Sequence, residues 1–269
     1  MITSEEFDCI YHDAIKNKIA IPDPKLIITY GPPSSGKGYI IDDFVIKELN
    51  IPQTSIIRAN VDEIVAKIKG YQNEIEQCKV YFSNILLNKD VDKTWSSKCN
   101  SIYKKYRCES ADIIVEKLLK YGIEKKLNII FETTGGNVTW VIDNLISDAK
   151  KNGFTIYVVY PIANINIMAH RLLSRARVEG RYPELDVVKL IVDKAQTNII
   201  TLLPHVNYIY IYDNNCLPVK MVIIQKLNDD KYHAQCKINK LDNFLDDRSD
   251  TFKNEIIKLC STGDNLVDD

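Results

Sequence analysis

The chain has 269 residues, of which 45% are hydrophobic and 26% are charged, close to the composition of an ordinary soluble globular protein. Its formal net charge is −1, whereas a protein that binds nucleic-acid phosphates is usually more basic. No apolar run approaches the roughly 20 residues that span a bilayer, and the acidic start lacks the apolar stretch of a signal peptide. We therefore expect a cytoplasmic protein that binds neither a membrane nor nucleic acid.

The predicted elements alternate along the chain. Short β-branched runs predict strands at residues 25–30, 54–59, 127–132, 155–160 and 207–213. Helical spacing of apolar residues predicts helices at 38–49, 109–126, 138–151, 164–178 and 186–203, with a mixed helical segment at 61–108. This alternation implies a parallel sheet with helices on both faces. Further on, runs at 219–227 and 231–238 suggest a hairpin, and a helix is expected after Lys240.

The loop after the first predicted strand carries the clearest motif. Its sequence, Gly31-Pro32-Pro33-Ser34-Ser35-Gly36-Lys37-Gly38, matches the phosphate-binding P-loop G-x-x-x-x-G-K. Backbone N–H groups of such a loop form an anion nest at a helix N-terminus, and Lys37 would reach the β- and γ-phosphates of ATP. We assign residues 31–39 to a nucleotide site; a glycine-rich turn is the alternative.

The P-loop departs from the common pattern at one position. Gly38 stands where most P-loops carry the Ser or Thr that binds Mg²⁺, and the next residue, Tyr39, has no aliphatic hydroxyl. The Mg²⁺ that accompanies ATP must then be held by other groups or through water. The sequence names no metal ligand, and its four histidines lack ligand spacing.

These features predict the fold class and its parts. We expect a P-loop, three-layer α/β/α core at residues 25–214 with a mainly parallel five-stranded sheet. A helical insertion would occupy 66–108, and an N-terminal extension 1–24. Residues 215–269 would form a C-terminal extension, a small hairpin and helix packed on or beside the core. The seven scattered cysteines include no C-x-x-C pair, which is typical of free thiols in a reducing compartment.

Two carboxylates lie near the ends of predicted strands. Asp62 follows the second strand and Glu132 ends the third. Ligands of open α/β sheets bind beyond the carboxyl ends of the strands, and a carboxylate there can take the proton of an acceptor hydroxyl as phosphate transfers. The alternatives are a helix N-cap for Asp62 and a satisfied strand-end residue for Glu132.

Arginine is scarce, with seven residues against 28 lysines. Four of the seven, Arg171, Arg175, Arg177 and Arg181, lie within eleven positions after the fourth predicted strand. The planar guanidinium grips phosphate oxygens bidentately, so a mobile lid rich in arginine could stabilise a migrating phosphoryl group. Arg171 and Arg175 share a helix face. A solvated helix face with ordinary cations is the alternative.

The ordered set of motifs resembles the zeta-toxin family of P-loop kinases. The set comprises the P-loop, a strand ending in Asn60-x-Asp62, a strand ending in Glu132-x-Thr134, an arginine before Pro183, and a long helix carrying Thr197-Asn198. The resemblance covers roughly residues 25–225. It implies that Lys37 contacts the ATP phosphates, Asp62 is the base, and Arg181 stabilises the transferred phosphoryl.

The resemblance also suggests an acceptor site. Glu132 and Thr134 would help to hold the substrate, and an acidic residue on the helix before the third strand would be Asp112 or Glu116. In bacterial members the acceptor is UDP-N-acetylglucosamine. The insertion at 66–108 falls where the acceptor should bind, so the acceptor is left open, as is an inhibitory protein partner.

Three functions compete at this point. The first is an ATP-dependent kinase of a small hydroxylated acceptor. The second is a nucleoside monophosphate kinase, which normally has a Thr after the G-K-G of its loop, or a polynucleotide 5′-kinase, for which the lysines are spread too evenly. The third is an ATP-binding regulatory module without turnover. The set of Asp62, Glu132 and Arg181 argues against the third, because a module that only binds needs no base.

Overall fold

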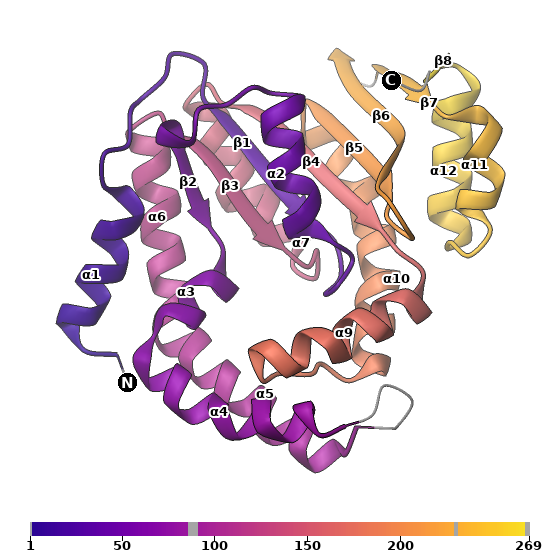
Figure 1. Ribbon diagram of the computed structural model, residues 1–269. Helices are drawn as coiled ribbons and strands as arrows, with labels where there is room; N and C mark the ends of the chain where they lie inside the picture. The colour runs from indigo at the N-terminus through magenta and orange to yellow at the C-terminus, as the bar shows by residue number, and fades with distance from the viewer. Residues whose placement is uncertain (1, 86–90, 229–230, 267–269) are drawn as a thin grey trace.

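One twisted sheet organises the computed structural model, which describes residues 2–85, 91–228 and 231–266. The strands run in the order β2-β3-β1-β4-β5-β6-β7-β8 (Figure 1). The strands are β1 Lys25–Tyr30, β2 Ile56–Ala59, β3 Asn128–Thr133, β4 Thr155–Ile162, β5 Tyr208–Asp213, β6 Val219–Asn228, β7 Lys231–Cys236 and β8 Asp264–Asn265. The five strands predicted at 25–30, 54–59, 127–132, 155–160 and 207–213 are confirmed, each to within about two residues.

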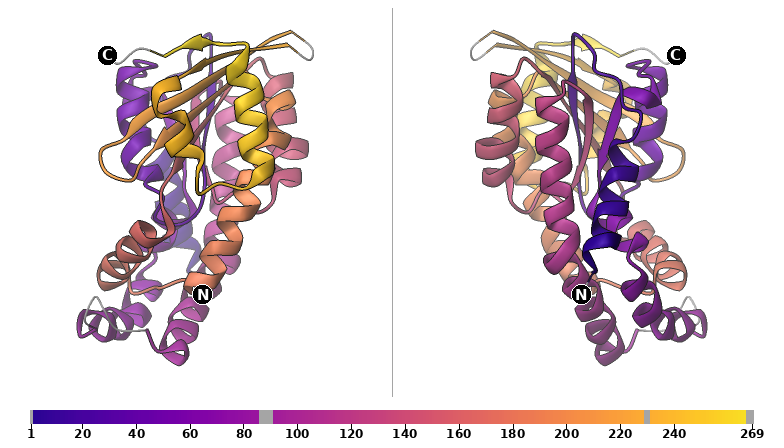
Figure 2. Two further views of the ribbon diagram at one scale, coloured as in Figure 1. Left: turned by 90° about the vertical axis from the view of Figure 1, so that its right-hand side faces the viewer. Right: turned by 90° about the vertical axis from the view of Figure 1, so that its left-hand side faces the viewer.

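Helices cover both faces of the sheet, as predicted (Figure 2). The helices are α1 Ser4–Ile15, α2 Lys37–Lys47, α3 Val61–Lys67, α4 Lys69–Ser83, α5 Lys93–Tyr106, α6 Asp112–Glu124, α7 Val138–Trp140, α8 Ser147–Lys151, α9 Ile165–Glu179, α10 Leu185–Leu202, α11 Ile238–Leu245 and α12 Asp250–Ser261. Short 3₁₀ or π turns lie at η1 Gln53–Ser55, η2 Arg107–Ala111, η3 Val141–Ile146 and η4 Leu203–His205. In the described ranges, no helix has both the length and the apolarity to cross a membrane.

The alternation of side chains along β1 explains the three layers. Leu26 and Ile28 belong to the larger core, on the side that also buries α6, α8 and α10. Ile27 points to the opposite face and packs in a smaller core with Phe44 and Val45 of α2. All three β1 side chains are fully buried, as expected for a parallel strand between two helical layers.

The predicted hairpin is part of the main sheet and not a separate small unit. Strands β2, β3, β1, β4 and β5 pair in parallel, whereas β6 pairs antiparallel with β5, placing Val222 opposite Ile211. β7 and β8 extend the same sheet. The expected count of five strands therefore rises to eight among the described residues. Residues 229 and 230 of the expected turn, like 86–90 of the expected insertion and 1 and 267–269 at the ends, lie outside those residues.

The segment between β2 and α6 forms a helical arm beside the sheet (Figure 1). It contains α3, α4 and α5 and joins α6 through the η2 turn. α4 packs against both α5 and α9. The arm therefore places α4 against α9, the helix that carries most of the predicted arginine lid.

The expectation of free thiols is wrong for four of the seven cysteines. Cys78 of α4 forms a disulfide with Cys99 of α5, and Cys236 of β7 forms one with Cys260 of α12. All four lie buried where two elements pack together, which no short spacing reveals. The remaining three, Cys9, Cys108 and Cys216, are free and exposed.

Candidate active site

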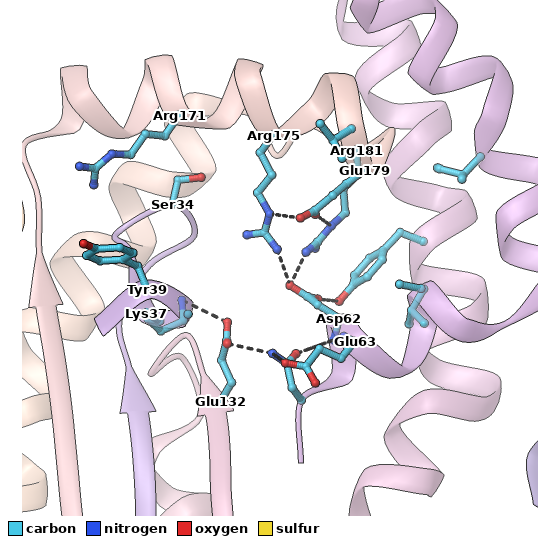
Figure 3. A pocket seen from close by; sticks show the side chains of 18 of the residues that line it. Ser34, Lys37, Tyr39, Asp62, Glu63, Glu132, Arg171, Arg175, Glu179 and Arg181 are labelled. Carbon is cyan, nitrogen blue, oxygen red and sulfur yellow. Dashed lines mark hydrogen bonds and ion pairs between the residues drawn. The ribbon is translucent and has the colours of Figure 1, made fainter. Parts of the chain in front are cut away.

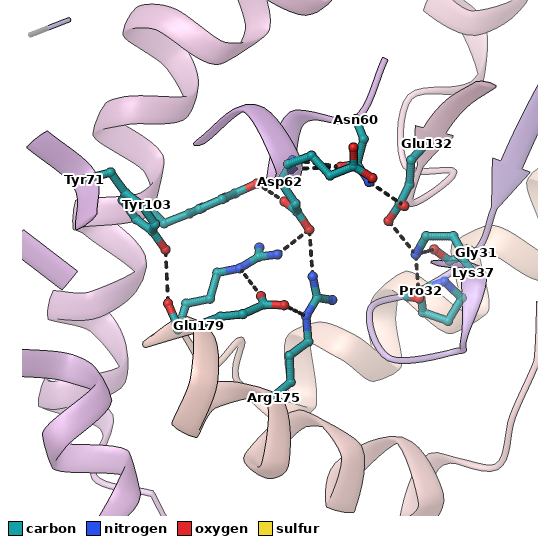
Figure 4. Close-up of polar contacts among 12 residues, drawn as sticks. Gly31, Pro32, Lys37, Asn60, Asp62, Tyr71, Tyr103, Glu132, Arg175 and Glu179 are labelled. Carbon is teal, nitrogen blue, oxygen red and sulfur yellow. Dashed lines mark hydrogen bonds and ion pairs between the residues drawn. The ribbon is translucent and has the colours of Figure 1, made fainter. Parts of the chain in front are cut away.

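The P-loop lies between β1 and α2, as predicted. Gly36 ends the loop in the left-handed region, with φ of 97°, and caps α2. Lys37 is 6% exposed, and its Nζ donates to the carbonyls of Gly31 at 2.8 Å and Pro32 at 2.9 Å (Figure 4). Burial lowers the pKa of Lys37, while Glu132 opposes the shift. The lysine is therefore held inside the loop, where a phosphate could replace the carbonyls as its partner.

Several polar groups around the loop are buried without a hydrogen-bond partner. The hydroxyls of Ser34 and Ser35 are among them, and so is Nη1 of Arg171 on α9. Buried polar groups are normally paired, so these unused groups fit a ligand with many oxygens. A polyphosphate supplies such oxygens.

Asn214, which the sequence reasoning missed, fastens the P-loop to the end of β5. Its side-chain amide donates to the backbone carbonyl of Ser35 at 2.7 Å. The backbone carbonyl of Asn214 accepts from Nη2 of Arg171 at 2.9 Å. Asn214 is buried. It thus connects the phosphate loop with the lid helix α9.

We expect Gly36→Ala to weaken ATP binding and lower the melting temperature. A Cβ at this position would overlap the amide nitrogen of Asn214, and the left-handed conformation costs a non-glycine residue roughly 1–2 kcal/mol. Calorimetric titration with ATP and thermal unfolding would measure both effects. Gly38→Ala is the matched control, because a Cβ there meets no atom within 4 Å. Equal losses in the two variants would contradict this account.

Asp62 lies at the centre of the site, on the first turn of α3. The N-cap alternative is wrong, because Asn60 caps this helix and accepts from the backbone N–H of Asp62 at 2.9 Å. The Asp62 carboxylate is left free for side chains. Its Oδ1 accepts from the Tyr103 hydroxyl at 2.5 Å (Figure 4), while Oδ2 accepts from Arg175 at 3.0 Å and from Arg181 (Figure 3).

Glu179 holds the same two arginines from the other side. Nε of Arg175 donates to Glu179 Oε1 at 2.5 Å, and Nε of Arg181 donates to Oε2 at 3.2 Å. Burial by itself would raise the pKa of Asp62, but Arg181 and Arg175 hold this pKa at about 2. Asp62 also raises the pKa of Arg181 against the effect of burial. The carboxylate and both arginines are therefore charged at neutral pH.

Glu132 connects the P-loop to the cap of α3. One carboxylate oxygen lies 3.6 Å from Lys37 Nζ, and the other accepts from Asn60 Nδ2 at 3.0 Å (Figure 4). Glu132 therefore has polar partners, as expected for a satisfied residue at a strand end. It also lies between the phosphate loop and Asp62. A run of polar contacts leads from Lys37 through Glu132 and Asn60 to the backbone N–H of Asp62.

Two cavities meet at the Asp62 carboxylate. The first, about 840 Å³, is lined by Ser34 and residues 36–39 of the P-loop, by arginines 171, 175 and 181, and by residues 214 and 216–218. The second, about 950 Å³, is lined by the predicted acceptor residues Asp112, Glu116 and Thr134, and by Pro33, Lys104, Arg107, Asn137 and Trp140. Both are lined by Lys37, Asn60, Asp62, Tyr103, Glu132, Arg175 and Arg181. These seven residues form the junction between two binding spaces.

Arg177 falls outside the predicted cluster. Its guanidinium donates to the carbonyl of Ile85 at 2.6 Å, and it lines neither cavity. The sequence reasoning also missed Tyr103. Asn60 entered it only through the family motif, although Asn followed three residues later by Glu63 is a helix-start signal.

The site fits a nucleotide better than a protein-bound metal. In the ranges that the structure describes, no three His, Cys, Asp or Glu side chains gather to hold a metal ion. Gly38 offers no hydroxyl beside the phosphate loop. Any Mg²⁺ would be held mainly by phosphate oxygens and water, with Glu132 and Asp62 as the nearby oxygen donors.

The parallel sheet, the P-loop and the paired cavities define a protein of the P-loop kinase-like class. The model of the zeta toxin family matches residues 11–217, so the chain belongs to the zeta toxin family, and the resemblance inferred from the motifs is confirmed. Members of this family are P-loop kinases. No curated protein matches the sequence.

Comparison with solved structures finds similar chains at low sequence identity. One belongs to the PezAT chromosomal toxin–antitoxin system of Streptococcus pneumoniae, with a TM-score of 0.53, 18% identity and 81% of each chain covered. The native AvrRxo1-ORF1:-ORF2 complex has a TM-score of 0.49 and 13% identity, covering 84% of this chain and 68% of that one. The complex with ATP has a TM-score of 0.48 and 12% identity, covering 95% and 83%.

Proposed function

We propose that this protein is an ATP-dependent kinase that moves the γ-phosphoryl group of ATP to a hydroxyl of a small acceptor. The observation that carries the proposal is the position of Asp62. Its carboxylate lies at the junction of the two cavities and contacts two arginines that also line both. A base and phosphate-binding cations at one point between two binding spaces suit phosphoryl transfer better than nucleotide storage.

ATP would occupy the first cavity. Lys37 and the loop N–H groups would hold its phosphates, and the spare Nη1 of Arg171 adds a cation on the lid side. Mg²⁺ bound to the nucleotide would supply charge neutralisation of the phosphate oxygens. Gly36 and Asn214 fix the loop that receives them.

The acceptor hydroxyl would give its proton to Asp62 as the phosphoryl group arrives. In the described arrangement Arg175 and Arg181 bind Asp62 and keep its pKa low, at about 2, which makes it a weak base. Phosphate oxygens offer these guanidinium groups a competing partner. Binding of ATP would then draw the arginines toward the phosphates and leave Asp62 more basic.

The second cavity suits a nucleotide sugar such as a UDP-N-acetyl sugar. Lys104 and Arg107 provide cations for a diphosphate, Asp112 and Glu116 provide acceptors for sugar hydroxyls, and Trp140 provides an aromatic face. Its volume of about 950 Å³ lies in the range of small-molecule sites. Because the carboxylates of Asp112 and Glu116 line the same cavity, it fits the phosphate backbone of a polynucleotide less well than a nucleotide sugar.

The test follows label from γ-labelled ATP and Mg²⁺ into separate pools of UDP-sugars, nucleoside monophosphates, and DNA or RNA with 5′-hydroxyl ends. Label in the UDP-sugar pool is expected. Label only in the nucleoside monophosphate pool or the polynucleotide pool would instead support a nucleoside monophosphate kinase or a polynucleotide 5′-kinase. ATP binding without transfer to any pool, or to the protein itself, would reduce the protein to a regulatory module.

Arg181→Lys is expected to slow transfer about tenfold or more although the charge is kept, because one ammonium cannot bind Asp62 and Glu179 as the guanidinium fork does. Rates at saturating ATP and acceptor would show the loss. Arg177→Lys is the matched control, since Arg177 lies on the same lid but contacts Ile85. An unchanged rate in the Arg181 variant would move this role to Arg175 or Arg171.

The Streptococcus pneumoniae structure comes from a toxin–antitoxin system, and we extend to this chain the proposal of an inhibitory protein partner. Tyr39 and Leu217 line the nucleotide cavity and are exposed, so a partner resting there would obstruct ATP. Protein that co-purifies with the chain and competes with ATP would support this proposal. A partner that binds without affecting ATP affinity would contradict it.

A further inference from the structure

The hydroxyl of Tyr103 occupies the position where an acceptor hydroxyl is needed. Tyr103 belongs to α5 of the helical arm, and its side chain lines both cavities. The hydroxyl donates to Asp62 Oδ1 at 2.5 Å (Figure 4). A phenol O–H is thus already bound to the group that we propose as the base.

The groups that would bind the phosphoryl lie at the other oxygen of the same carboxylate. Oδ2 of Asp62 accepts from Arg175 and from Arg181, and the Arg181 guanidinium also lies 4.2 Å from the centre of the Tyr103 ring. Nucleophile, proton acceptor and phosphate-binding cations therefore meet within one cluster of four side chains. No small-molecule acceptor is needed to complete it.

We propose that, when the acceptor cavity is empty, this kinase transfers the γ-phosphoryl group of ATP to its own Tyr103. The inference rests on the proposed function. The Tyr103 oxygen forms a bond to the γ-phosphorus, the bond between that phosphorus and the β–γ bridging oxygen breaks, and ADP leaves. The phenol proton passes to Asp62. Burial raises the pKa of Tyr103, so the phenol is protonated at neutral pH and requires this base.

Neighbouring tyrosines lack this arrangement. The hydroxyl of Tyr71 donates to the carbonyl of Glu179 at 3.2 Å, and that of Tyr30 donates to the carbonyl of Ala195 at 3.1 Å. Neither is bound to a carboxylate that could accept its proton. The transfer should therefore be specific for Tyr103, even though Tyr71 lines the same nucleotide cavity.

Phosphorylation of Tyr103 would inactivate the kinase. The phosphate would bring a charge of about −1.5 to −2 next to Arg181 and Arg175, which would bind it. It would also occupy the space beside Asp62 that the acceptor hydroxyl must reach. In the modified protein the phosphate would block access to Asp62 and would bind Arg175 and Arg181. The reaction would therefore limit the activity of the kinase when its acceptor is absent.

The test incubates the full-length protein with γ-labelled ATP and Mg²⁺ without acceptor, and locates the label by peptide mass spectrometry. One phosphoryl group on Tyr103 is expected, with a rate constant independent of protein concentration because the reaction is intramolecular. Tyr103→Phe should leave label at background, whereas the matched variant Tyr106→Phe, on the same helix but lining neither cavity, should be labelled. Asp62→Asn should slow labelling about 100-fold or more.

A second measurement follows activity toward the acceptor after preincubation with ATP alone. The unmodified protein should lose activity as label accumulates, while Tyr103→Phe should keep a constant fraction of its own initial rate. Melting temperatures of the variants would confirm that each is folded. Label on another residue, or no loss of activity as Tyr103 becomes labelled, would overturn the inference.

The two proposals fail in different ways. Transfer to a small acceptor without any label on the protein would overturn self-phosphorylation and leave the kinase function in place. Absence of both kinds of transfer would overturn both. Label on Tyr103 without transfer to any pool would support the catalytic cluster and direct the search to an acceptor outside the pools.

Discussion

Asp62→Asn is expected to lower the rate of phosphoryl transfer by roughly 100- to 10,000-fold, the contribution of a positioned general base, while ATP still binds. The amide has the shape of the carboxylate but cannot take the acceptor proton. It also cannot hold two guanidinium groups by charge, so Arg175 and Arg181 become free for phosphate. Single-turnover rates and calorimetric titration would separate transfer from binding. Undiminished turnover would remove Asp62 as the base.

Glu63→Gln is the matched control for this variant. Glu63 is the next residue of α3 and also lines the nucleotide cavity, but its side chain is exposed and contacts Asn60, not an arginine. We expect a much smaller loss of transfer. A similar loss in both variants would indicate a general effect of charge near the phosphates, with no special role for Asp62.

The pH profile offers an independent check on the same carboxylate. The pKa of Asp62 is lowered to about 2, so its ionised form persists as pH falls until about that value and is lost below it. Between pH 7 and pH 4, kcat/KM for ATP, which reports the protein without bound nucleotide, should show no acid limb from Asp62. Arg175→Gln removes one cation, so the pKa rises and an acid limb should appear at higher pH than in the unmodified protein.

Lys37→Ala is expected to abolish detectable transfer and to weaken ATP binding about tenfold or more, because the ammonium bridges the β- and γ-phosphates in P-loop enzymes. It also leaves the Gly31 and Pro32 carbonyls without their donor, and an unpaired buried acceptor costs about 1–3 kcal/mol. A lower melting temperature should accompany the loss of activity. Calorimetric titration with ATP and thermal unfolding would measure the two effects.

Lys67→Ala is the control for this second variant. Lys67 ends α3 in an exposed position, so its loss changes the charge of the protein by the same amount without touching the loop. We expect ATP affinity and stability close to those of the unmodified protein. Retained transfer in Lys37→Ala would place the nucleotide phosphates away from the P-loop and contradict the assignment of the first cavity.

Local pattern was sufficient to predict the parallel strands and the phosphate loop. The run at residues 25–30 is mostly apolar, with the β-branched residues Ile27, Ile28 and Thr29 at its centre, so its conformation and burial follow from neighbouring residues. The P-loop is likewise a contiguous motif. Asp62 and Glu132 could be nominated because strand ends meet at one edge of a parallel sheet, and Arg175 and Arg181 because four of the seven arginines cluster after the fourth strand.

The partners of these side chains could not be predicted in the same way. Tyr103 reaches Asp62 only because α5 packs on α4 and joins α6 through the η2 turn. Asn214 lies 179 positions from the carbonyl that it holds, and the pairing of Cys78 with Cys99 depends on the same packing of α4 and α5. Each contact is set by how helices dock, for which a single sequence carries little signal.

The antiparallel strand β6 has a practical consequence for dissecting this protein. The zeta toxin match ends at residue 217, but the hydrogen-bonded sheet continues through β6 and β7, and the backbone N–H of Ser249 donates to Gln196 of α10 at 2.7 Å. A chain shortened to the family boundary would expose the bare edge of β5 and invite pairing with other copies. Aggregation of such a fragment would then report a broken sheet edge and reveal nothing about catalysis.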